Sequence, residues 1–358
     1  MTRATVLKGR GAASNPASRF DSLSGEPVDD GWSSLEEVMG ALPPVTEILA
    51  DATRTVIARN DSPDIPFDQS VNPYRGCEHG CIYCYARPTH NYLGMSSGID
   101  FETKILAKHD VAALLRAELA KPSYRCRPLA LGTNTDPYQP IERQLSLTRS
   151  ILEVLRDCRH PVGIVTKSSL VLRDLDILGD MARNGLVRVY LSVTTLDRTL
   201  ARRLEPRATA PHRRLETIGM LDGAGIPAGV MTAPVIPGLN DHEIESLLEA
   251  ARDAGAKGAG YVLLRLPHDV KELFHEWLEQ HYPLRRRHVL SLLGQMRGGK
   301  LNDPAFNTRM RGTGVYADLI QRRFRRACER LGLNRERMPS RCDLFRQPGR
   351  DGQLDLFA

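Results

Sequence analysis

The chain has 358 residues, of which 41% are hydrophobic, so it can form one large domain or two ordinary domains with a sizeable core. No run approaches the roughly 18 consecutive apolar residues that a membrane span requires. Residues 1–20 lack the apolar segment of an export signal, and seven cysteines are an odd number for a disulfide framework. We therefore expect a cytoplasmic globular protein with reduced cysteines and no membrane association.

The net charge of +6 is unevenly distributed along the sequence. Residues 284–341 contain fifteen Lys or Arg and four Asp or Glu. Within them, apolar residues recur at helical spacing over 316–331, which predicts a helix with arginines on its other faces. A segregated basic block indicates a polyanionic partner such as DNA, although such a run is more often a solvated helix face.

Residues 1–65 contain clusters of Gly, Ser, Pro and Asp, with short apolar stretches at 35–42 and 45–49, and predict an irregular N-terminal arm. After residue 65, short apolar runs alternate with longer amphipathic stretches, which is the pattern of β/α units. The predicted strands are 68–74, 128–133, 162–166, 186–193, 228–235 and 260–266. The predicted helices follow Tyr85 and then occupy 111–120, 141–159, 172–182, 211–224 and 241–254.

Six strand–helix repeats in strict alternation predict an α/β fold with parallel strands and right-handed crossovers. Since only helices are indicated after residue 267, the expected architecture is an open, six-stranded partial barrel at 66–268. A basic helical extension is expected at 269–341 and a flexible tail at 342–358. Reactive side chains in such barrels gather where the strands end, at the C-terminal rim.

Three cysteines lie close together just after the first predicted strand. Cys77, Cys81 and Cys84 have C-x-x-x-C-x-x-C spacing, and Gly76 and Gly80 allow the tight curl that would bring the thiols to one cluster. This spacing indicates an iron–sulfur cluster with one iron lacking a protein thiolate. A zinc site completed by His79 and His90 is the alternative, and with it a non-catalytic zinc or iron–sulfur module that binds nucleic acid.

The cysteine spacing, with Tyr83 directly before the third cysteine, resembles the cluster loop of the radical S-adenosylmethionine (SAM) superfamily. Further stretches at strand ends are similar to spore photoproduct lyase and related uncharacterised bacterial proteins, namely 132–136, 165–167, 191–193 with 205–206, and 233–236. The resemblance implies a 4Fe-4S cluster on the three cysteines whose open iron binds SAM. It also implies reductive cleavage of SAM to a 5′-deoxyadenosyl radical, with electrons from a donor such as flavodoxin or ferredoxin.

The same resemblance implies a set of SAM contacts. Tyr83 and Ala233 would line the adenine, Thr135 and Asp136 would bind the amino group, and Lys167 and Ser192 would lie near the carboxylate and ribose. An ammonium group suits a carboxylate and a hydroxyl, and a lysine suits a carboxylate. For Lys167 and Ser192 the alternatives are a strand-end salt bridge and a satisfied core hydroxyl.

One position departs from the lyase. The lyase has a cysteine at the end of its second strand that returns a hydrogen atom to the product, and Thr133 stands here instead. A hydroxyl is a far poorer hydrogen-atom donor, so the same reaction by the same route is not expected. The expected activity is a radical SAM reaction on a nucleic acid, as lyase-like DNA repair or modification. Modification of a small molecule or peptide remains the alternative.

The last residues carry a further motif. The sequence at 353–357, Gln-Leu-Asp-Leu-Phe, resembles the short peptide by which bacterial replication and repair proteins dock on the DNA sliding clamp. Its leucines and phenylalanine would be apolar anchors in a hydrophobic cleft. A short apolar end that folds back onto its own domain is the alternative, since short motifs also arise by chance.

Overall fold

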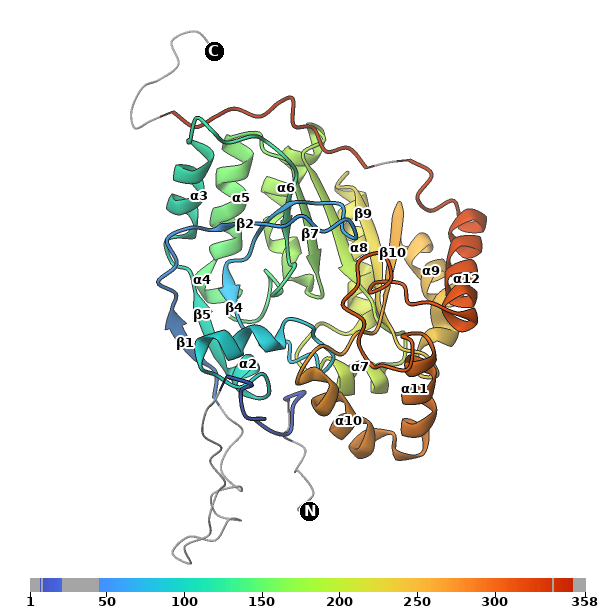
Figure 1. Ribbon diagram of the computed structural model, residues 1–358. Coiled ribbons are helices and arrows are strands. Elements are labelled where there is room, and N and C mark those ends of the chain that lie inside the picture. Colours follow the sequence, from blue (N-terminus) through green and yellow to red (C-terminus); the bar gives the residue numbers. More distant parts are fainter. Residues whose placement is uncertain (1–6, 8, 21–44, 337, 350–358) are drawn as a thin grey trace, which may run out of the picture.

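The computed structural model describes residues 7, 9–20, 45–336 and 338–349 (Figure 1). Its core is a seven-stranded sheet with strand order β10-β9-β8-β7-β6-β3-β2. All neighbours among the first six are parallel, and β2 (Ile57–Arg59) joins the edge antiparallel to β3. The parallel strands are β3 (Gln69–Val71), β6 (Leu129–Leu131), β7 (Val162–Thr166), β8 (Val187–Ser192), β9 (Ala228–Val235) and β10 (Gly258–Leu263).

The six predicted strands are therefore confirmed in position and order. Their apolar side chains are buried, as in β7, where Val162 and Ile164 are at most 2% exposed. The prediction missed the seventh strand, and the sheet is mixed rather than purely parallel. A second, three-stranded sheet was also missed, with order β1-β5-β4 and strands β1 (Glu47–Ala50), β5 (Lys104–Ala107) and β4 (Tyr74–Arg75).

Amphipathic helices pack along the sheet, with α3 against α5, α5 against α6, α8 against β8 and α9 against β9. They are α3 (Val111–Leu119), α4 (Glu142–Leu145), α5 (Leu147–Asp157), α6 (Leu175–Arg183), α7 (Arg198–Leu204), α8 (Pro211–Gly223) and α9 (Ile244–Asp253). Short helical turns are η1 (Arg87–Leu93), α2 (Asp100–Thr103), η2 (Ser169–Asp174) and η3 (Asp241–Glu243). In the described part of the chain, no helix is both long enough and apolar enough to span a bilayer.

Two helix predictions need correction. The helix expected over 141–159 breaks at Ser146, whose φ is +51°, because the buried Glu142 carboxylate accepts the Thr148 N–H at 3.1 Å and pairs with Arg173 at 2.8 Å. Helix α7 was not predicted. Its signal was Asp197, whose carboxylate caps the helix by accepting the Thr199 N–H at 2.7 Å.

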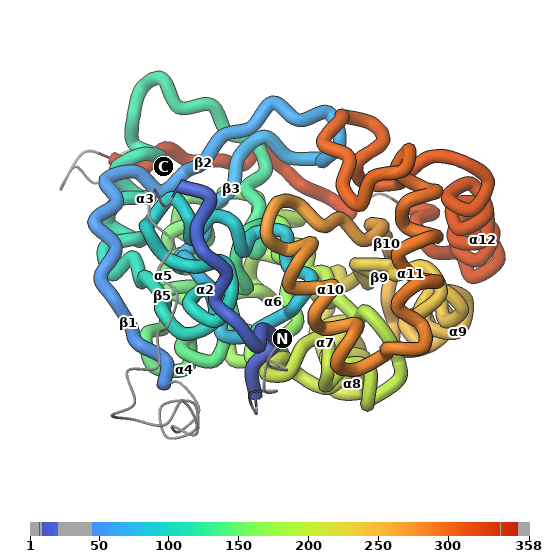
Figure 2. Tube along the Cα trace, turned by 60° about the horizontal axis from the view of Figure 1, so that its bottom comes forward, coloured from blue at the N-terminus to red at the C-terminus, as the bar shows by residue number. Residues whose placement is uncertain are grey.

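The C-terminal extension bridges the open side of the sheet. It contains α10 (Val270–His281), α11 (Pro283–Gln295) and α12 (Val315–Leu331). Between α11 and α12, Arg309 pairs with Asp64 at 2.5 Å, and the Met310 carbonyl accepts the Leu263 N–H beside β10 at 2.9 Å. Figure 2 shows this orange segment beside the blue segment that follows β2. Residues from both ends of the chain therefore connect the two edge strands.

Helix α12 has the amphipathic form that the sequence predicts, with Ile320, Phe324 and Ala327 buried, although Leu319 is exposed. It lies beside α9 (Figure 1), and Arg323 and Arg330 pair with the α9 residues Glu245 and Glu249, each at 2.6 Å. Residues 342–349, which the sequence placed in the tail, contact the core through Phe345, whose ring lies 5.6 Å from Tyr124. The possible clamp motif at 353–357 and the apolar stretch at 35–42 lie outside the described residues.

His160 provides a pH test of the fold. It is fully buried, its Nδ1 donates to the Pro161 carbonyl at 3.0 Å, and burial lowers its pKa to about 4. As the pH falls, the His160 imidazole is protonated at a higher pH in the unfolded chain, where its pKa is about 6.5, than in the folded chain. We expect the free energy of unfolding to fall between about pH 6.5 and pH 4, by up to about 1.4 kcal/mol per pH unit from this residue.

Urea denaturation over this pH range measures the effect. His160→Asn should have a shallower pH dependence than the wild type, whereas His212→Asn, at an exposed position of α8, should not. Equal slopes for the wild type and His160→Asn would contradict the prediction.

Candidate active site

The cysteine loop, residues 77–84, lies beyond the C-terminal end of β3 and is held by its backbone. The Cys77 N–H donates to the Phe101 carbonyl at 2.9 Å, and the Ile82 N–H donates to the Leu204 carbonyl at the end of α7 at 3.1 Å. Arg87 donates from Nε to the Cys81 carbonyl at 2.9 Å. The loop is therefore fixed by elements on both sides of it, and these bonds leave the thiol groups unused.

Two glycines give the loop its tight curl, as the sequence predicts. Gly76 and Gly80 have φ values of +81° and +64°, which favour glycine. A Cβ on Gly80 would also lie 2.6 Å from the Glu102 carboxylate. The backbone here is therefore packed too closely for a side chain.

Glu102 was not predicted, although it anchors the loop. It is fully buried and pairs with the equally buried Arg87 at 2.5 Å. Its two carboxylate oxygens also accept the N–H groups of Gly11 and Ala12, each at 2.9 Å. A Cβ on Gly11 would lie 1.8 Å from the Gly80 carbonyl oxygen, so the N-terminal segment lies directly against the cysteine loop.

Glu78 and Gln139 form a second anchor. The Glu78 N–H donates to the Gln139 side chain at 2.8 Å, and Gln139 donates in turn to the Gly76 carbonyl at 3.2 Å. The Glu78 carboxylate accepts the Ile141 N–H at 2.7 Å and pairs with Arg207 at 3.1 Å. The loop is thus joined to the segment between β6 and α4 and to the segment between α7 and α8.

The cysteine thiols lie within electrostatic range of one another. Burial raises the pKa of Cys77 well above its usual value, and Cys81 and Cys84 raise it further. Burial also raises the pKa of Cys81 to about 12. Cys77 accepts a hydrogen bond from the Asp136 N–H, which favours its thiolate. The raised pKa values mean that metal binding at Cys77 and Cys81 must release their protons.

All seven cysteines are free. In the ranges that the structure describes, no three His, Cys, Asp or Glu side chains meet closely enough to hold one metal ion. The two histidines of the zinc alternative, His79 and His90, join no such group, although His90 Nε2 donates to the Lys104 carbonyl at 2.9 Å and His79 Nδ1 lies 3.3 Å from the Asp136 carboxylate. The three neighbouring thiols, with their backbone held by other groups, fit a multi-iron cluster better than a tetrahedral zinc ion.

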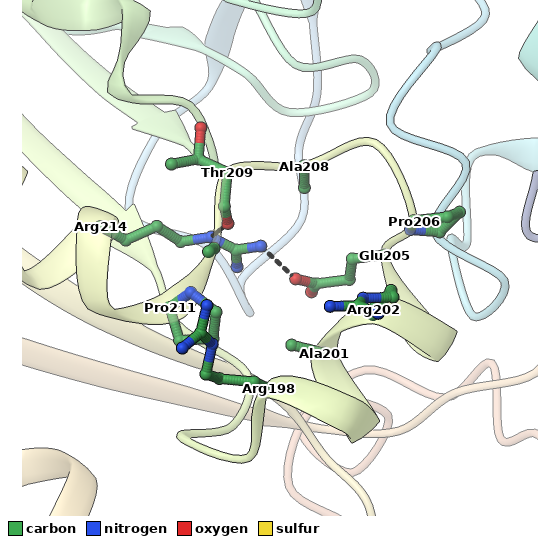
Figure 3. Close-up of a pocket in the computed structure, with 10 residues that line it drawn as sticks. Arg198, Ala201, Arg202, Glu205, Pro206, Ala208, Thr209, Pro211 and Arg214 are labelled. Atoms are coloured by element: carbon green, nitrogen blue, oxygen red, sulfur yellow. Dashed lines mark hydrogen bonds and ion pairs between the residues drawn. The ribbon is translucent and has the colours of Figure 1, made fainter. Parts of the chain in front are cut away.

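Tyr83 connects the loop to a buried ion pair. Its hydroxyl donates to Glu205, which also accepts the Thr194 hydroxyl at 2.6 Å and pairs with Arg214 at 2.5 Å. Figure 3 shows the Glu205–Arg214 pair in a pocket of about 150 Å³ between α7 and α8. The Tyr83 hydroxyl is therefore used within the protein, and its side chain is buried at the edge of the core.

The structure places the other predicted SAM contacts at the ends of β6, β7, β8 and β9. Asp136 is occupied by protein donors, since it accepts the Thr166 hydroxyl and the Lys167 N–H, both at 2.7 Å. Burial alone would raise its pKa, but these bonds and His79 lower it to about 2. Two predicted hydroxyls donate to backbone carbonyls, Thr135 to Tyr74 at 3.1 Å and Ser192 to Ala233 at 3.3 Å.

Lys167 differs from these residues. Its Nζ lies 5.9 Å from the centre of the Tyr83 ring, and within the described ranges it makes no hydrogen bond or ion pair. The strand-end salt bridge considered as its alternative is therefore not formed with any described residue. Burial alone would lower the pKa of Lys167, but the charges of Cys81 and Glu205 raise it, so the amine is held in its charged form.

Tyr85 was not predicted as a site residue. It directly follows Cys84, is 45% exposed, and its hydroxyl donates to the carbonyl of Thr133. Thr133 is the residue that the sequence resemblance matches to the hydrogen-donating cysteine of the lyase. The only sequence signal for Tyr85 was its position directly after the third cysteine.

Comparisons with known proteins agree with this geometry. Residues 71–251 match the family model described as the radical SAM superfamily. The chain is 38% identical over 271 residues to uncharacterised proteins of Mycobacterium tuberculosis and Mycobacterium bovis, covering 73% of this chain and 80% of each relative. The chain belongs to the radical SAM superfamily. It is thus a radical SAM enzyme, as the cysteine spacing predicted, and the family implies a 4Fe-4S cluster and SAM.

More distant relatives support the fold. An uncharacterised protein of Methanocaldococcus jannaschii is 30% identical over 176 residues, covering 48% of this chain and 62% of that protein. Solved structures of spore photoproduct lyase, including one complexed with dinucleoside spore photoproduct, have a TM-score of 0.56 and 19% identity, with 80% of each chain covered. The α/β fold with its mixed, mostly parallel sheet is therefore consistent with a radical SAM partial barrel.

Gly11 tests the contact between the N-terminal segment and the loop. In Gly11→Ala the new Cβ would overlap the Gly80 carbonyl oxygen, so the segment must move away from Glu102. We expect a loss of about 1–3 kcal/mol in the free energy of unfolding and a lower iron content after anaerobic reconstitution. Denaturant titration and iron analysis measure the two effects.

Gly223→Ala is the matched control, because a Cβ there, within α8, would have nothing within 4 Å. It should keep its iron and be unchanged or slightly more stable. Equal stability and equal iron content in the two variants would show that the contact at Gly11 is unimportant.

Proposed function

We propose that this enzyme holds a 4Fe-4S cluster on Cys77, Cys81 and Cys84, cleaves SAM reductively, and acts on a nucleic acid. The observation that carries the proposal is the cysteine loop itself, with three neighbouring thiols on a backbone bonded to residues elsewhere in the chain. When bound, the cluster and SAM would supply a 5′-deoxyadenosyl radical that abstracts hydrogen. The protein's part is to hold the thiolates, orient SAM and exclude water.

Lys167 is the best-supported SAM contact. Its ammonium group has no ion-pair partner among the described residues and lies over the ring of Tyr83, which directly precedes Cys84. From this position it would bind the SAM carboxylate. Ser192 and the Ala233 carbonyl are already hydrogen-bonded to each other, so we propose that they shape the ribose and adenine side of the pocket. The Thr135 hydroxyl and the Asp136 carboxylate already form hydrogen bonds within the protein. They would bind the amino group of SAM only through the remaining lone pairs of these oxygens.

The nucleic acid substrate rests on two supports. The fold is shared with spore photoproduct lyase, one of whose structures contains a dinucleoside photoproduct, and the C-terminal extension is rich in arginine. Thr133 replaces the hydrogen-donating cysteine of the lyase, so we propose a different return of the hydrogen atom. The Tyr85 hydroxyl, which donates to the Thr133 carbonyl, is a candidate for this step, because a phenolic O–H gives up a hydrogen atom far more readily than the alcohol O–H of a threonine.

Partners remain predictions. A flavodoxin or ferredoxin would supply the electron for SAM cleavage, and the motif at 353–357 would dock on a sliding clamp. Modification of a small molecule or peptide requires the same cluster and differs only in the substrate. Family membership argues against a non-catalytic zinc or iron–sulfur module.

Cys81→Ala tests the cluster assignment. After anaerobic reconstitution with iron and sulfide, the wild type should be brown and should release 5′-deoxyadenosine from SAM when reduced with dithionite. The variant should lose the cluster absorbance and the product, because two thiolates cannot replace three. Cys342→Ala, in the C-terminal segment, is the control and should keep both. A cluster-replete wild type that releases no 5′-deoxyadenosine would refute the proposed activity.

Lys167→Gln tests the SAM carboxylate contact. Loss of a charge-assisted hydrogen bond should weaken SAM binding about tenfold or more, with the iron content unchanged. Calorimetric titration of the reconstituted protein with SAM measures this. Lys271→Gln, at an exposed lysine of α10 that pairs with Glu272, should bind SAM like the wild type. Wild-type affinity in Lys167→Gln would remove Lys167 from the SAM site.

A further inference from the structure

Arg265 is a half-buried cation at the C-terminal rim of the barrel. It follows β10 by two residues, and in the part of the chain that the structure describes its guanidinium makes no hydrogen bond or ion pair. Its guanidinium carbon lies 4.8 Å from the centre of the Tyr85 ring. Stacking on an aromatic ring leaves the N–H donors of a guanidinium free.

Tyr85 places this arginine beside the reaction site. The tyrosine directly follows Cys84, and its hydroxyl reaches the Thr133 carbonyl just beyond β6. Arg265 comes from the opposite edge strand and lies over the Tyr85 ring, which is partly exposed. The guanidinium therefore stands at the open side of the barrel, next to the proposed cluster.

In the described part of the chain no carboxylate forms an ion pair with Arg265. Burial lowers its pKa and Arg309 lowers it further, whereas Tyr85, Asp64 and Cys84 raise it. Asp64, the nearby carboxylate, is already paired with Arg309 at 2.5 Å. Arg297 adds another positive charge and donates to the Leu264 carbonyl at 2.6 Å. A desolvated cation without a partner is costly, so this site favours an arriving anion.

Lys167 and Arg265 are two cations on neighbouring aromatic rings of the loop. Lys167 lies over the ring of Tyr83 and Arg265 over the ring of Tyr85, the residues before and after Cys84 in the sequence. The first is assigned above to the SAM carboxylate. The second is not among the assigned SAM contacts, and it is available to the other molecule that must enter the barrel, the substrate.

We propose that Arg265 binds a phosphate group of the substrate beside Tyr85, which makes the substrate a phosphate-bearing nucleotide or polynucleotide. This inference rests on the proposed radical SAM function and names its substrate class. The planar guanidinium fork matches two phosphate oxygens, and the Tyr85 ring beneath it keeps the fork in place.

Oligonucleotide binding tests the proposal. Reconstituted full-length protein is titrated into a short, fluorescein-labelled single-stranded DNA, and anisotropy is followed at several salt concentrations. Arg265→Gln should bind about tenfold more weakly, with a salt slope smaller by about one, and Arg265→Lys should recover part of the affinity. Arg183→Gln, at an exposed arginine of α6 that pairs with Asp180 and lies outside the basic block, is the matched control and should bind like the wild type.

Further arms identify the ligand. The same oligonucleotide with an uncharged methylphosphonate backbone should bind the wild type no better than the phosphodiester binds Arg265→Gln. Displacement of the DNA by thymidine monophosphate would identify a mononucleotide as sufficient, and failure to displace it would identify the polymer. Unchanged iron content and melting temperature in Arg265→Gln ensure that a weaker affinity reports the contact.

Equal affinities of the wild type and Arg265→Gln would overturn the proposal, as would equal binding of the methylphosphonate or no binding by the wild type. Release of 5′-deoxyadenosine by the wild type is measured separately. Arg265-dependent DNA binding without that release would refute the radical SAM function and leave the phosphate site standing. Release of 5′-deoxyadenosine without Arg265-dependent DNA binding would refute the phosphate site and leave the radical SAM function standing.

Discussion

The structure depends on one constraint, which is that the backbone of the cysteine loop must be satisfied without its thiols. A buried peptide group that lacks a hydrogen bond costs about 1–3 kcal/mol, so a loop this curved needs outside partners. Gln139, Arg87 and the ends of α2 and α7 provide them. The hold on the loop therefore comes from backbone and side-chain groups outside the three thiols.

These partners explain why segments far apart in the sequence are required for one site. Glu102 forms an ion pair with Arg87 and accepts the N–H groups of residues 11 and 12. The N-terminal segment is therefore part of the support of the cysteine loop. Ser14 continues this contact to Glu276 of α10 at 2.8 Å. Asp64 and Arg309 then join the two edges of the sheet. The extension after β10 thus supports the barrel and borders its open side.

The sequence was sufficient where the signal is local. Strand and helix periods, the cysteine spacing and the two glycines lie within short windows, and the six parallel strands and the tight loop were predicted from them. Contacts that depend on distant partners were not predicted. Strand β1 pairs with β5 more than 50 residues away, and neither Glu102 nor Arg265 belongs to a motif, so their neighbours became visible only in the structure. Likewise, the break at Ser146 depends on Arg173, which lies on another element.

Charge distribution shows the same difference between sequence and structure. The count over 284–341 suggests a broad cationic surface, but Arg323 and Arg330 are compensated by glutamates of α9, and Arg286 pairs with Glu279 at 3.0 Å. The number of phosphates neutralised sets the salt dependence of nucleic acid binding, with a slope of about 0.9 per contact. Arginines that already have acidic partners contribute little to that number. Under the proposal above, Arg265 adds to that number at the barrel mouth itself, where a substrate phosphate would lie close to the reaction site.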